Sequence, residues 1–344
     1  MMEHYTTSPW LEELNAGVAG AVSLLANSLL IFVTSRVKSY SEPVRWAQYY
    51  ACLFRLLFSI LVVLSAPTVM YISEVKSLYI VKGGVDMSRD IGAYLLNVFV
   101  VLVITSCTGP TVQCLQVAYL LSNPGLKNHV LLRTLISLIP FIVAVPTFVL
   151  ISIGYTPNAY EMRLSEELIR EITSHEDSSF LIASEEKIFD ETSGSFEYDV
   201  PARVCTFFMF AVMLLSLLVV VVSFAHIQKS MKKKKKALSS QTQKTQRQLN
   251  LLLMVQFVFP FLTIHIPFYT AFMLPFLDIE FKFLSSKLPF LFAWCPAINP
   301  ILVICMVKNV RDTLLNRKTT PTSGLMTFTS SHVHSNVRSS KFKR

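Results

Sequence analysis

The sequence predicts an all-α membrane protein, a seven-transmembrane helix bundle with its N-terminus outside the cell and its C-terminus in the cytoplasm. Three observations support this prediction. Hydrophobic residues make up 52% of the 344-residue chain and charged residues 15%, whereas about a quarter of the residues of a soluble domain are charged. The hydrophobic residues gather in seven blocks, each long enough for the helix of about 20 residues that crosses a bilayer. Basic residues concentrate in alternate connections between these blocks.

Each block is expected to be a helix, because the polar groups of a backbone in lipid must pair within their own segment. The predicted helices cover residues 14–35, 46–72, 91–121, 131–155, 201–226, 249–277 and 288–307. Residues 1–13 hold acidic but no basic residues, so the first block lacks the positive flank of a signal peptide and is expected to remain as a helix. Residues 1–308 then form one membrane domain. Residues 309–344 form a cytoplasmic tail that is basic and rich in Ser and Thr, and we expect it to be largely disordered.

The predicted orientation follows from the charges of the connections. Residues 227–248 carry eight basic residues and no acidic one, whereas residues 156–200 carry twelve acidic and three basic residues. Because basic residues favour the cytoplasmic side, the N-terminus and residues 156–200 are expected outside. The basic connection is also a candidate for contact with anionic lipid headgroups or with a cytosolic partner. The residues proposed for this coupling are Lys232, Lys233, Lys234, Lys235, Lys236 and Arg247.

The acidic segment 156–200 has two interpretations. The favoured one is a solvated loop that keeps its charges in water. The alternative is a short helix, because Leu164, Leu168, Ile169 and Ile172 would share one helical face.

Polar residues in the outer half of the predicted bundle indicate a ligand site. The third block is the most polar, so it is expected to lie centrally, with Tyr94 and Asn97 in its outer half. In the sixth block, His265 and Tyr269 are four residues apart and share a helical face. Together with Trp294 in the seventh block, these four residues form the candidate ligand-binding set. The alternatives are interhelical hydrogen bonds for Asn97 and a buried structural role for His265.

Arg55 lies well inside the second block, where a charge is costly. We expect its long side chain to snorkel toward the cytoplasmic face, or to pair with carbonyls or amides inside the bundle. Either role is favoured over contact with a substrate.

Prolines mark candidate hinges in the last two blocks. Pro260 and Pro267 interrupt the sixth block, and Pro296 and Pro300 flank Asn299 in the seventh. Proline has no N–H, so Pro300 cannot donate to the carbonyl of Pro296. We expect the amide of Asn299, with water and the polar third helix, to satisfy such carbonyls. A static kink is the alternative to a hinge.

The sequence contains no recognisable pattern of residues for catalysis or for cofactor binding. It shows no nucleophile beside a base, no paired carboxylates, no metal-ligand spacing and no glycine-rich phosphate loop. The six cysteines lie in or beside apolar blocks, as small core residues do. We therefore expect no enzymatic activity, no cofactor, no metal and no nucleic-acid partner.

Several stretches resemble a known family. They are "YYACLFRLLFSILVVLSAPTVMYISEVKSLYIV", "RQLNLLLMVQFVFPFLTIHIP" and "PAINPILVICMVKNVR", together with Asn27 in the first block. In order and spacing they resemble the Str-type superfamily of serpentine chemoreceptors of nematodes, and the last stretch is also similar to the Asn-Pro element of rhodopsin-like receptors. Two features depart from the family pattern: Arg55 replaces an acidic residue, and Gln116, Val117 and Ala118 replace an aromatic-Arg-aromatic element. Residues 156–200 contain no cysteine, so the cysteine pair of many rhodopsin-like receptors cannot form.

The resemblance implies a G-protein-coupled, olfactory-type receptor for environmental chemicals, in the plasma membrane of a sensory neuron and its cilium. In such a receptor a small molecule binds between the outer helix halves, and the sixth helix moves to admit a heterotrimeric G protein. Asn27 would join the prolines and Asn299 in the switch, membrane lipids would surround residues 1–308, and the tail could receive an arrestin-like protein.

Two other functions remain open from the sequence. A seven-helix ligand-gated channel of inverted topology would place the basic residues 227–248 outside, against their charge. A small-solute transporter would be expected to show internal repeats, and none is visible.

Overall fold

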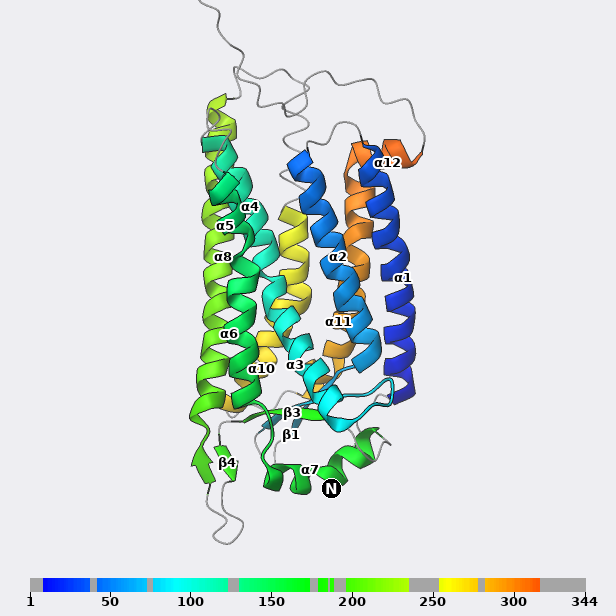
Figure 1. Ribbon diagram of the computed structural model, residues 1–344, viewed down its shortest axis with the longest axis vertical. Coiled ribbons are helices and arrows are strands. Elements are labelled where there is room, and N and C mark those ends of the chain that lie inside the picture. The colour runs from blue at the N-terminus through cyan, green and yellow to red at the C-terminus, as the bar shows by residue number, and fades with distance from the viewer. Residues whose placement is uncertain are drawn as a thin grey trace, which may run out of the picture.

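The computed structural model describes residues 9–37, 42–72, 77–122, 130–173, 179–184, 186–188, 196–234, 254–277 and 282–315. Its long helices run side by side as one bundle (Figure 1). Seven helical stretches of the described chain are long and apolar enough to cross a membrane. These spans are Trp10–Arg36, Gln48–Ser65, Arg89–Tyr119, Thr134–Gly154, Val200–Ser230, Met254–Met273 and Lys287–Met306. The predicted seven-helix membrane fold is confirmed.

Four spans are single helices and three are interrupted. The single helices are α1 (Pro9–Arg36), α2 (Glu42–Ser65), α8 (Val200–Lys234) and α11 (Lys282–Met306). The third span joins α3 (Arg89–Ser106) to α4 (Thr108–Ser122), and the fourth joins α5 (Val130–Ser137) to α6 (Ile139–Gly154). In the sixth, helical residues 254–260 pass into the π-helix Phe261–His265 and then into α10 (Ile266–Leu277). The short helix α12 (Lys308–Leu314) follows α11.

Each interruption lies beside a proline. Pro110 follows the turn at Cys107, Pro140 follows the turn at Leu138, and Pro267 follows the π-helix. Because proline cannot donate the i to i−4 hydrogen bond, the carbonyl one turn earlier loses its partner and the helix loosens there. In the π-helix the wider turn is closed by the N–H of Ile266, which donates to the carbonyl of Phe261.

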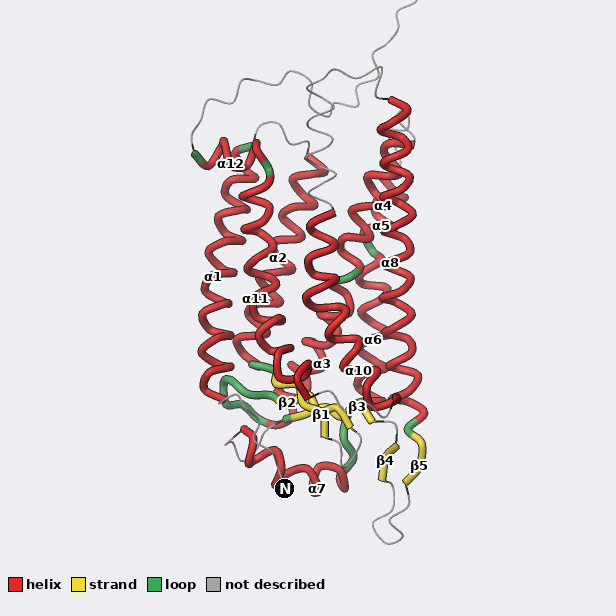
Figure 2. Tube along the Cα trace, turned by 180° about the vertical axis from the view of Figure 1, so that it is seen from behind, coloured by secondary structure: helices red, strands yellow, loops and turns green. Residues whose placement is uncertain are grey.

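A small antiparallel sheet crosses one end of the bundle (Figure 2). Its strands are β1 (Thr68–Ile72), β2 (Ser77–Val81) and β3 (Phe180–Ser184), in that order. Thr68 pairs with Val81, which in turn pairs with Phe180, so the connection between α6 and α8 adds the third strand to the β1–β2 pair. Two further strands, β4 (Glu186–Ile188) and β5 (Phe196–Tyr198), pair beside the sheet. We call this end of the bundle the sheet end, and the opposite one the α12 end.

The strands correct two predictions. Residues 68–72 do not continue the second helix, because Pro67 lies just after the last helical residue and Ala66 adopts φ 31°, in the left-handed region. The run "TVMYI" then extends as a strand, which suits its β-branched and aromatic residues. The second error is the solvated loop at 156–200. Its described part forms β3, with every residue buried, and α7 (Ala159–Thr173), the alternative helix.

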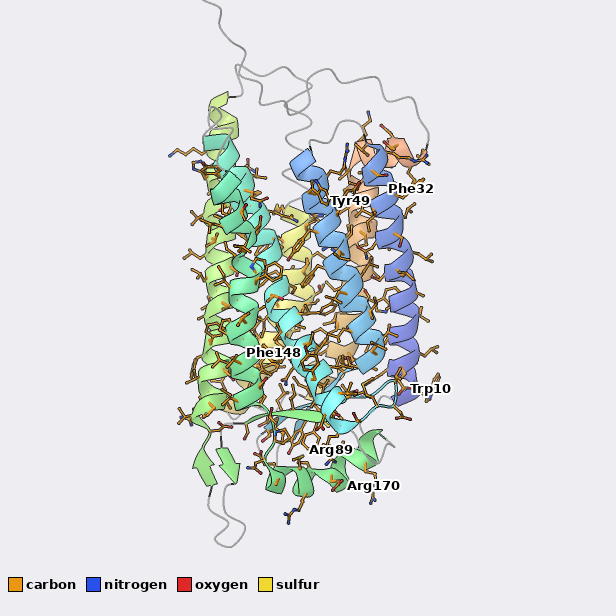
Figure 3. The ribbon with its side chains drawn as sticks, in the orientation of Figure 1. Trp10, Phe32, Tyr49, Arg89, Phe148 and Arg170 are labelled. Atoms are coloured by element: carbon orange, nitrogen blue, oxygen red, sulfur yellow. The ribbon has the colours of Figure 1, made fainter. Side chains whose placement is uncertain are left out.

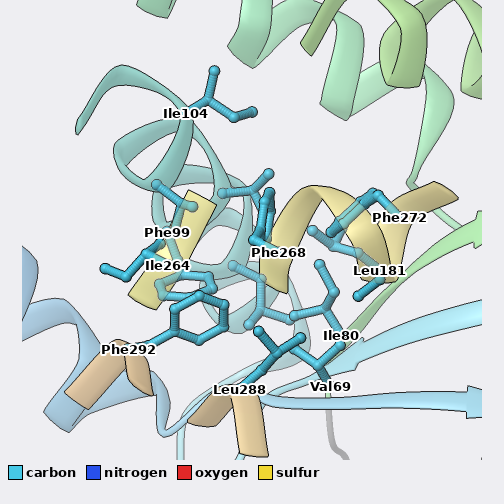
Figure 4. Packing of buried hydrophobic residues seen from close by; sticks show 14 of the residues in the cluster. Val69, Ile80, Phe99, Ile104, Leu181, Ile264, Phe268, Phe272, Leu288 and Phe292 are labelled. Carbon is cyan, nitrogen blue, oxygen red and sulfur yellow. The ribbon is translucent and has the colours of Figure 1, made fainter. Parts of the chain in front are cut away.

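The two faces of the sheet bury different partners. Side chains alternate along each strand, so Val69, Leu78, Ile80 and Leu181 join the bundle core with aromatic residues of α3, α10 and α11 (Figure 4). Met70, Tyr79, Phe180 and Ile182 point to the other face and pack against Ile169 of α7. An ion pair of 3.2 Å between Arg89, at the start of α3, and Glu166 also holds α7 in place (Figure 3). The sheet is therefore a packed layer between the bundle and α7.

The outer surface and the cysteines suit a membrane environment. Large apolar side chains of α1, α6 and α8 are exposed, for example Leu25, Val145 and Leu215, and such a surface in water would be a liability. All six cysteines are free thiols, and all but Cys305 are buried. This confirms the expectation for five of them as small core residues.

Helices α6 and α8 approach closely at one glycine. A Cβ atom added to Gly154 would lie 2.9 Å from the carbonyl oxygen of Pro201 and 3.1 Å from Cα of Ala202. These are backbone atoms, which cannot rotate away. At Gly17 in α1, by contrast, an added Cβ atom meets nothing within 4 Å.

We expect Gly154→Ala to destabilise the protein by about 1–3 kcal/mol, because the helices must separate to admit the methyl group. The matched change Gly17→Ala should be neutral, or stabilising by up to about 1 kcal/mol. The apparent unfolding temperature in detergent, followed by reaction of the buried cysteines with a thiol-reactive dye, measures both. Equal effects of the two changes would contradict the close approach.

Candidate functional site

A cavity of about 650 Å³ lies among the membrane-spanning helices, between their middle and the α12 end. Residues of α2, of the α3–α4 and α5–α6 segments, of the π-helical span and of α11 line it. They are Trp46, Tyr50, Ala51, Phe54, Arg55, Phe58, Thr105, Ser106, Gly109, Pro110, Val112, Gln113, Gln116, Thr134, Ser137, Pro140, Gln256, Pro260, Ile264, Cys295, Pro296 and Asn299. The volume is within the range of ligand sites, about 300–1,000 Å³.

The cavity coincides with the irregular turns of four helices. Pro110, Pro140, Pro260 and Pro296 all lie on its wall, and three of them belong to the interrupted spans. A proline ring displaces the preceding helical turn, so neighbouring helices cannot pack uniformly there. The prolines thus account for a hollow at this level of the bundle, whereas the sheet end is filled by aromatic side chains such as Phe99, Phe268 and Phe292.

Among the described residues that line the cavity, Arg55 is the one cationic side chain. Its Nη1 atom is buried and has no hydrogen-bond partner. The thiols of Cys52 and Cys295 lie near the guanidinium, and no described carboxylate forms an ion pair with it. The expectation that a carbonyl or amide satisfies this side chain is therefore wrong for Nη1.

His265 and Tyr269 form a buried polar group behind the cavity wall, although neither residue lines the cavity. Their ring centroids are 6.3 Å apart, and both side chains are 2% exposed. His265 Nε2 lies 3.4 Å from the hydroxyl of Ser106, which is itself on the cavity wall. Among the described residues, neither His265 Nδ1 nor the Tyr269 hydroxyl has a hydrogen-bond partner. Both atoms are free to bond to a ligand or to a water molecule.

The other three residues of the predicted ligand set do not join this group. Tyr94 is 58% exposed on the outside of the bundle, where its ring packs against Phe148 of α6 at 5.7 Å (Figure 3). Trp294 donates from Nε1 to Oδ1 of Asn15 at 2.8 Å, so it links α11 to α1. Asn97 is buried with an unpartnered Oδ1, but it is not on the cavity wall. The structure thus brings together two of the five residues.

The predicted hinge of α11 is bonded to α1. Asn27 Nδ2 donates to the carbonyl of Pro296 at 3.2 Å, which is the carbonyl that Pro300 leaves without a helical donor. The same amide bonds to the backbone and hydroxyl oxygens of Ser23, and Ser59 of α2 donates to the Ser23 hydroxyl at 2.6 Å. A polar link therefore joins three helices. The expectation that Asn299 satisfies this carbonyl is wrong, and Asn299 Oδ1 is itself buried without a partner.

Sequence reasoning missed the aromatic lining of the cavity. Trp46, Tyr50, Phe54 and Phe58 recur every four residues in α2, so they lie along one face of the helix. This four-residue spacing predicts one aromatic face of the helix and could have been recognised in the sequence. The amides Gln113, Gln116 and Gln256 also line the cavity. They come from two different spans, so no local sequence pattern predicts that they lie together.

The described part of the basic connection lies at the end of α8. Lys232, Lys233 and Lys234 are its last residues, and Lys232 is exposed. Lys235, Lys236 and Arg247 lie outside the described residues, as does the predicted tail after residue 315. Within the described chain, no group of three or more His, Cys, Asp or Glu residues could hold a metal ion.

Comparison with known proteins gives one family. The sequence model described as "Serpentine type 7TM GPCR chemoreceptor Str" matches residues 14–315, which cover the first span from residue 14 onward, the other six spans in full, and α12. No curated protein is found to match the chain.

The bond between Asn27 and Pro296 can be tested by a double-mutant cycle. We expect Asn27→Ala to cost about 1–2 kcal/mol of stability, because a buried carbonyl loses its donor. In Pro300→Ala the new backbone N–H can donate to the Pro296 carbonyl, so the further change Asn27→Ala should then cost much less. Unfolding temperatures of the four proteins in detergent measure the coupling. Strictly additive losses would show that Asn27 stabilises the protein by another route.

Proposed function

The chain belongs to the Str family of serpentine seven-transmembrane chemoreceptors, which is a family of G-protein-coupled receptors and not of enzymes; on this premise we propose that it binds a small environmental molecule between its helices and signals through a heterotrimeric G protein. The observation that carries this proposal is the cavity at the irregular turns. In the orientation inferred below, this cavity lies in the inner half of the bundle, whereas the resemblance implies a site between the outer helix halves. A ligand in the cavity would touch the four proline-containing helices at the places where they bend most easily.

Binding can shift a conformational equilibrium only if the ligand contacts the two states differently. The wall of the cavity offers such contacts, since Pro260 precedes the π-helix, Ile264 belongs to it, and Pro296 and Asn299 lie in the proline-containing part of α11. We infer that a bound ligand changes the angle of the sixth and seventh spans. His265 would take part, because its Nε2 atom lies beside the hydroxyl of Ser106 on the wall, and Tyr269 packs next to His265.

We infer further that the sheet end faces the exterior and the α12 end the cytoplasm of a sensory neuron, in its plasma membrane and cilium. The charge pattern supports this orientation, since the acidic segment 156–200 belongs to the sheet end and the lysine run begins at the far end of α8. In this orientation Lys232 and its neighbours are available to the G protein and to anionic lipids. The tail would be available to an arrestin-like protein.

His265→Ala tests the proposal in cells that carry a second-messenger reporter and are screened with volatile and soluble chemicals. We expect a dose response that moves to about tenfold higher concentration, equivalent to about 1.4 kcal/mol, at unchanged surface expression. His226→Ala is the matched control, because His226 is exposed on α8 far from the cavity. Loss of surface expression would assign His265 to folding. A ligand-evoked current without a second messenger would support a channel, and uptake of the ligand a transporter.

The orientation has a separate test. An epitope placed at the N-terminus should label intact cells, and one placed at the C-terminus should label only permeabilised cells. Each epitope serves as the control for the other. Labelling of the N-terminal epitope only after permeabilisation would contradict the orientation and, with it, the side on which the G protein is proposed to bind.

A further inference from the structure

Arg55 presents a positive charge to the cavity without a counter-charge among the described residues. Its Nη1 atom is buried and unpartnered, and the neighbouring groups Cys52 and Cys295 are thiols. A guanidinium within a membrane span is expensive unless it is paired, and such residues mark functional sites by default. The side chain lines the cavity, so the missing partner could be supplied by a bound molecule.

The rest of the wall defines what that molecule must look like. Besides Arg55, its polar groups are neutral hydroxyls, thiols and amides, including Ser106, Gln113 and Asn299. Among the residues that the structure describes, no second Lys or Arg and no Asp or Glu is on the wall. The described wall thus balances one negative charge. A dianionic phosphate monoester would leave one charge uncompensated in a medium of low dielectric, where that is costly.

Aromatic rings form the apolar part of the site. Trp46, Tyr50, Phe54 and Phe58 lie along one face of α2, the helix that also carries Arg55. Arg55 is one residue after Phe54, and both side chains line the cavity. A ligand with a single charged tip and an apolar body matches both features together.

We propose that this cavity binds the carboxylate of an apolar monocarboxylic acid, with Arg55 as the counter-ion and the aromatic stripe of α2 along the apolar body. Guanidinium and carboxylate are both planar, so two parallel N–H···O bonds can form, with a strength and direction that a lysine cannot reproduce. The amide of Gln113, which also lines the cavity, supplies a further donor.

Some lining residues of α2 and α5 are exposed at the surface of the protein. Trp46 and Tyr50 are 65% and 45% exposed, and Thr134 and Ser137 on the opposite side are also exposed, although all four line the cavity. Amphipathic rings at such a rim suit a ligand that arrives along the bilayer interface. The inference deepens the proposed function by naming a ligand class, but the binding itself does not depend on G-protein coupling.

Binding of decanoate to the full-length receptor in nanodiscs of neutral lipid tests the proposal. We expect decanoate to raise the unfolding temperature with saturation, and decanol and decyl phosphate to act only at concentrations at least about tenfold higher, since neither matches one cation in the same geometry. In Arg55→Gln the preference for decanoate over decanol should disappear, and in Arg55→Lys it should fall. Arg89→Gln, at the sheet end, is the matched control and should keep the preference.

Three results would overturn the proposal. They are equal binding of decanoate and decanol by the unmodified receptor, unchanged preference in Arg55→Gln, and loss of preference in Arg89→Gln. If Arg55→Gln does not fold, the comparison of decanoate with decanol on the unmodified receptor still tests the proposal.

Native mass spectrometry then identifies the source of the acid. A co-purified fatty acid supports this site with a membrane-derived ligand, and an empty receptor that takes up decanoate supports it with an environmental one. If decanoate binds but evokes no second messenger, the proposed carboxylate site is supported and the proposed receptor function is contradicted.

Discussion

A backbone carbonyl that loses its helical donor inside a membrane has no solvent to replace it, and this constraint organises the middle of the bundle. Proline creates the deficit in four spans. The chain meets one such deficit with the amide of Asn27, which crosses from α1 to the carbonyl of Pro296. Other irregular turns show further non-standard bonds: the N–H of Ile266 donates to the carbonyl of Phe261, and the hydroxyls of Thr105, Ser106 and Thr108 donate to carbonyls of the preceding turn.

The same constraint explains why the two ends of the bundle differ. The sheet end is closed by paired strands, buried aromatic side chains and α7, so its polar backbone is satisfied locally. The half toward the α12 end contains the cavity beside the prolines, and unpartnered polar atoms of Arg55, Gln256 and Asn299 lie on its wall. The sheet end is thus the rigid end of the bundle, and the half toward the α12 end is the adaptable one. This separation suits a receptor in which one end holds its shape while the other responds.

The sequence predicted what depends on composition and short spacing, and failed where distant segments meet. The seven spans follow from hydrophobic length, and the proximity of His265 to Tyr269 follows from their separation of four residues. The run at 68–72 is as apolar as the helix before it, so only its pairing with β2 and β3 reveals a strand. The bond from Asn27 to Pro296 spans 269 residues of sequence, and no local pattern encodes it. Tyr94 was expected at the ligand because of its depth in the span, but the rotation of α3 turns it outward.

The sheet has a geometric consequence for the third span. Lys82 donates its N–H to the carbonyl of Ser179 directly after β2, and Gly92 near the start of α3 is so close to Ser179 that a Cβ atom would be 2.2 Å from its hydroxyl. A slip of β2 by one residue would exchange the side chains of its two faces and draw the start of α3 along with it. The strand register therefore determines how deep in the bilayer the helix turn at Cys107 lies. It also determines the depth of the cavity beside that turn.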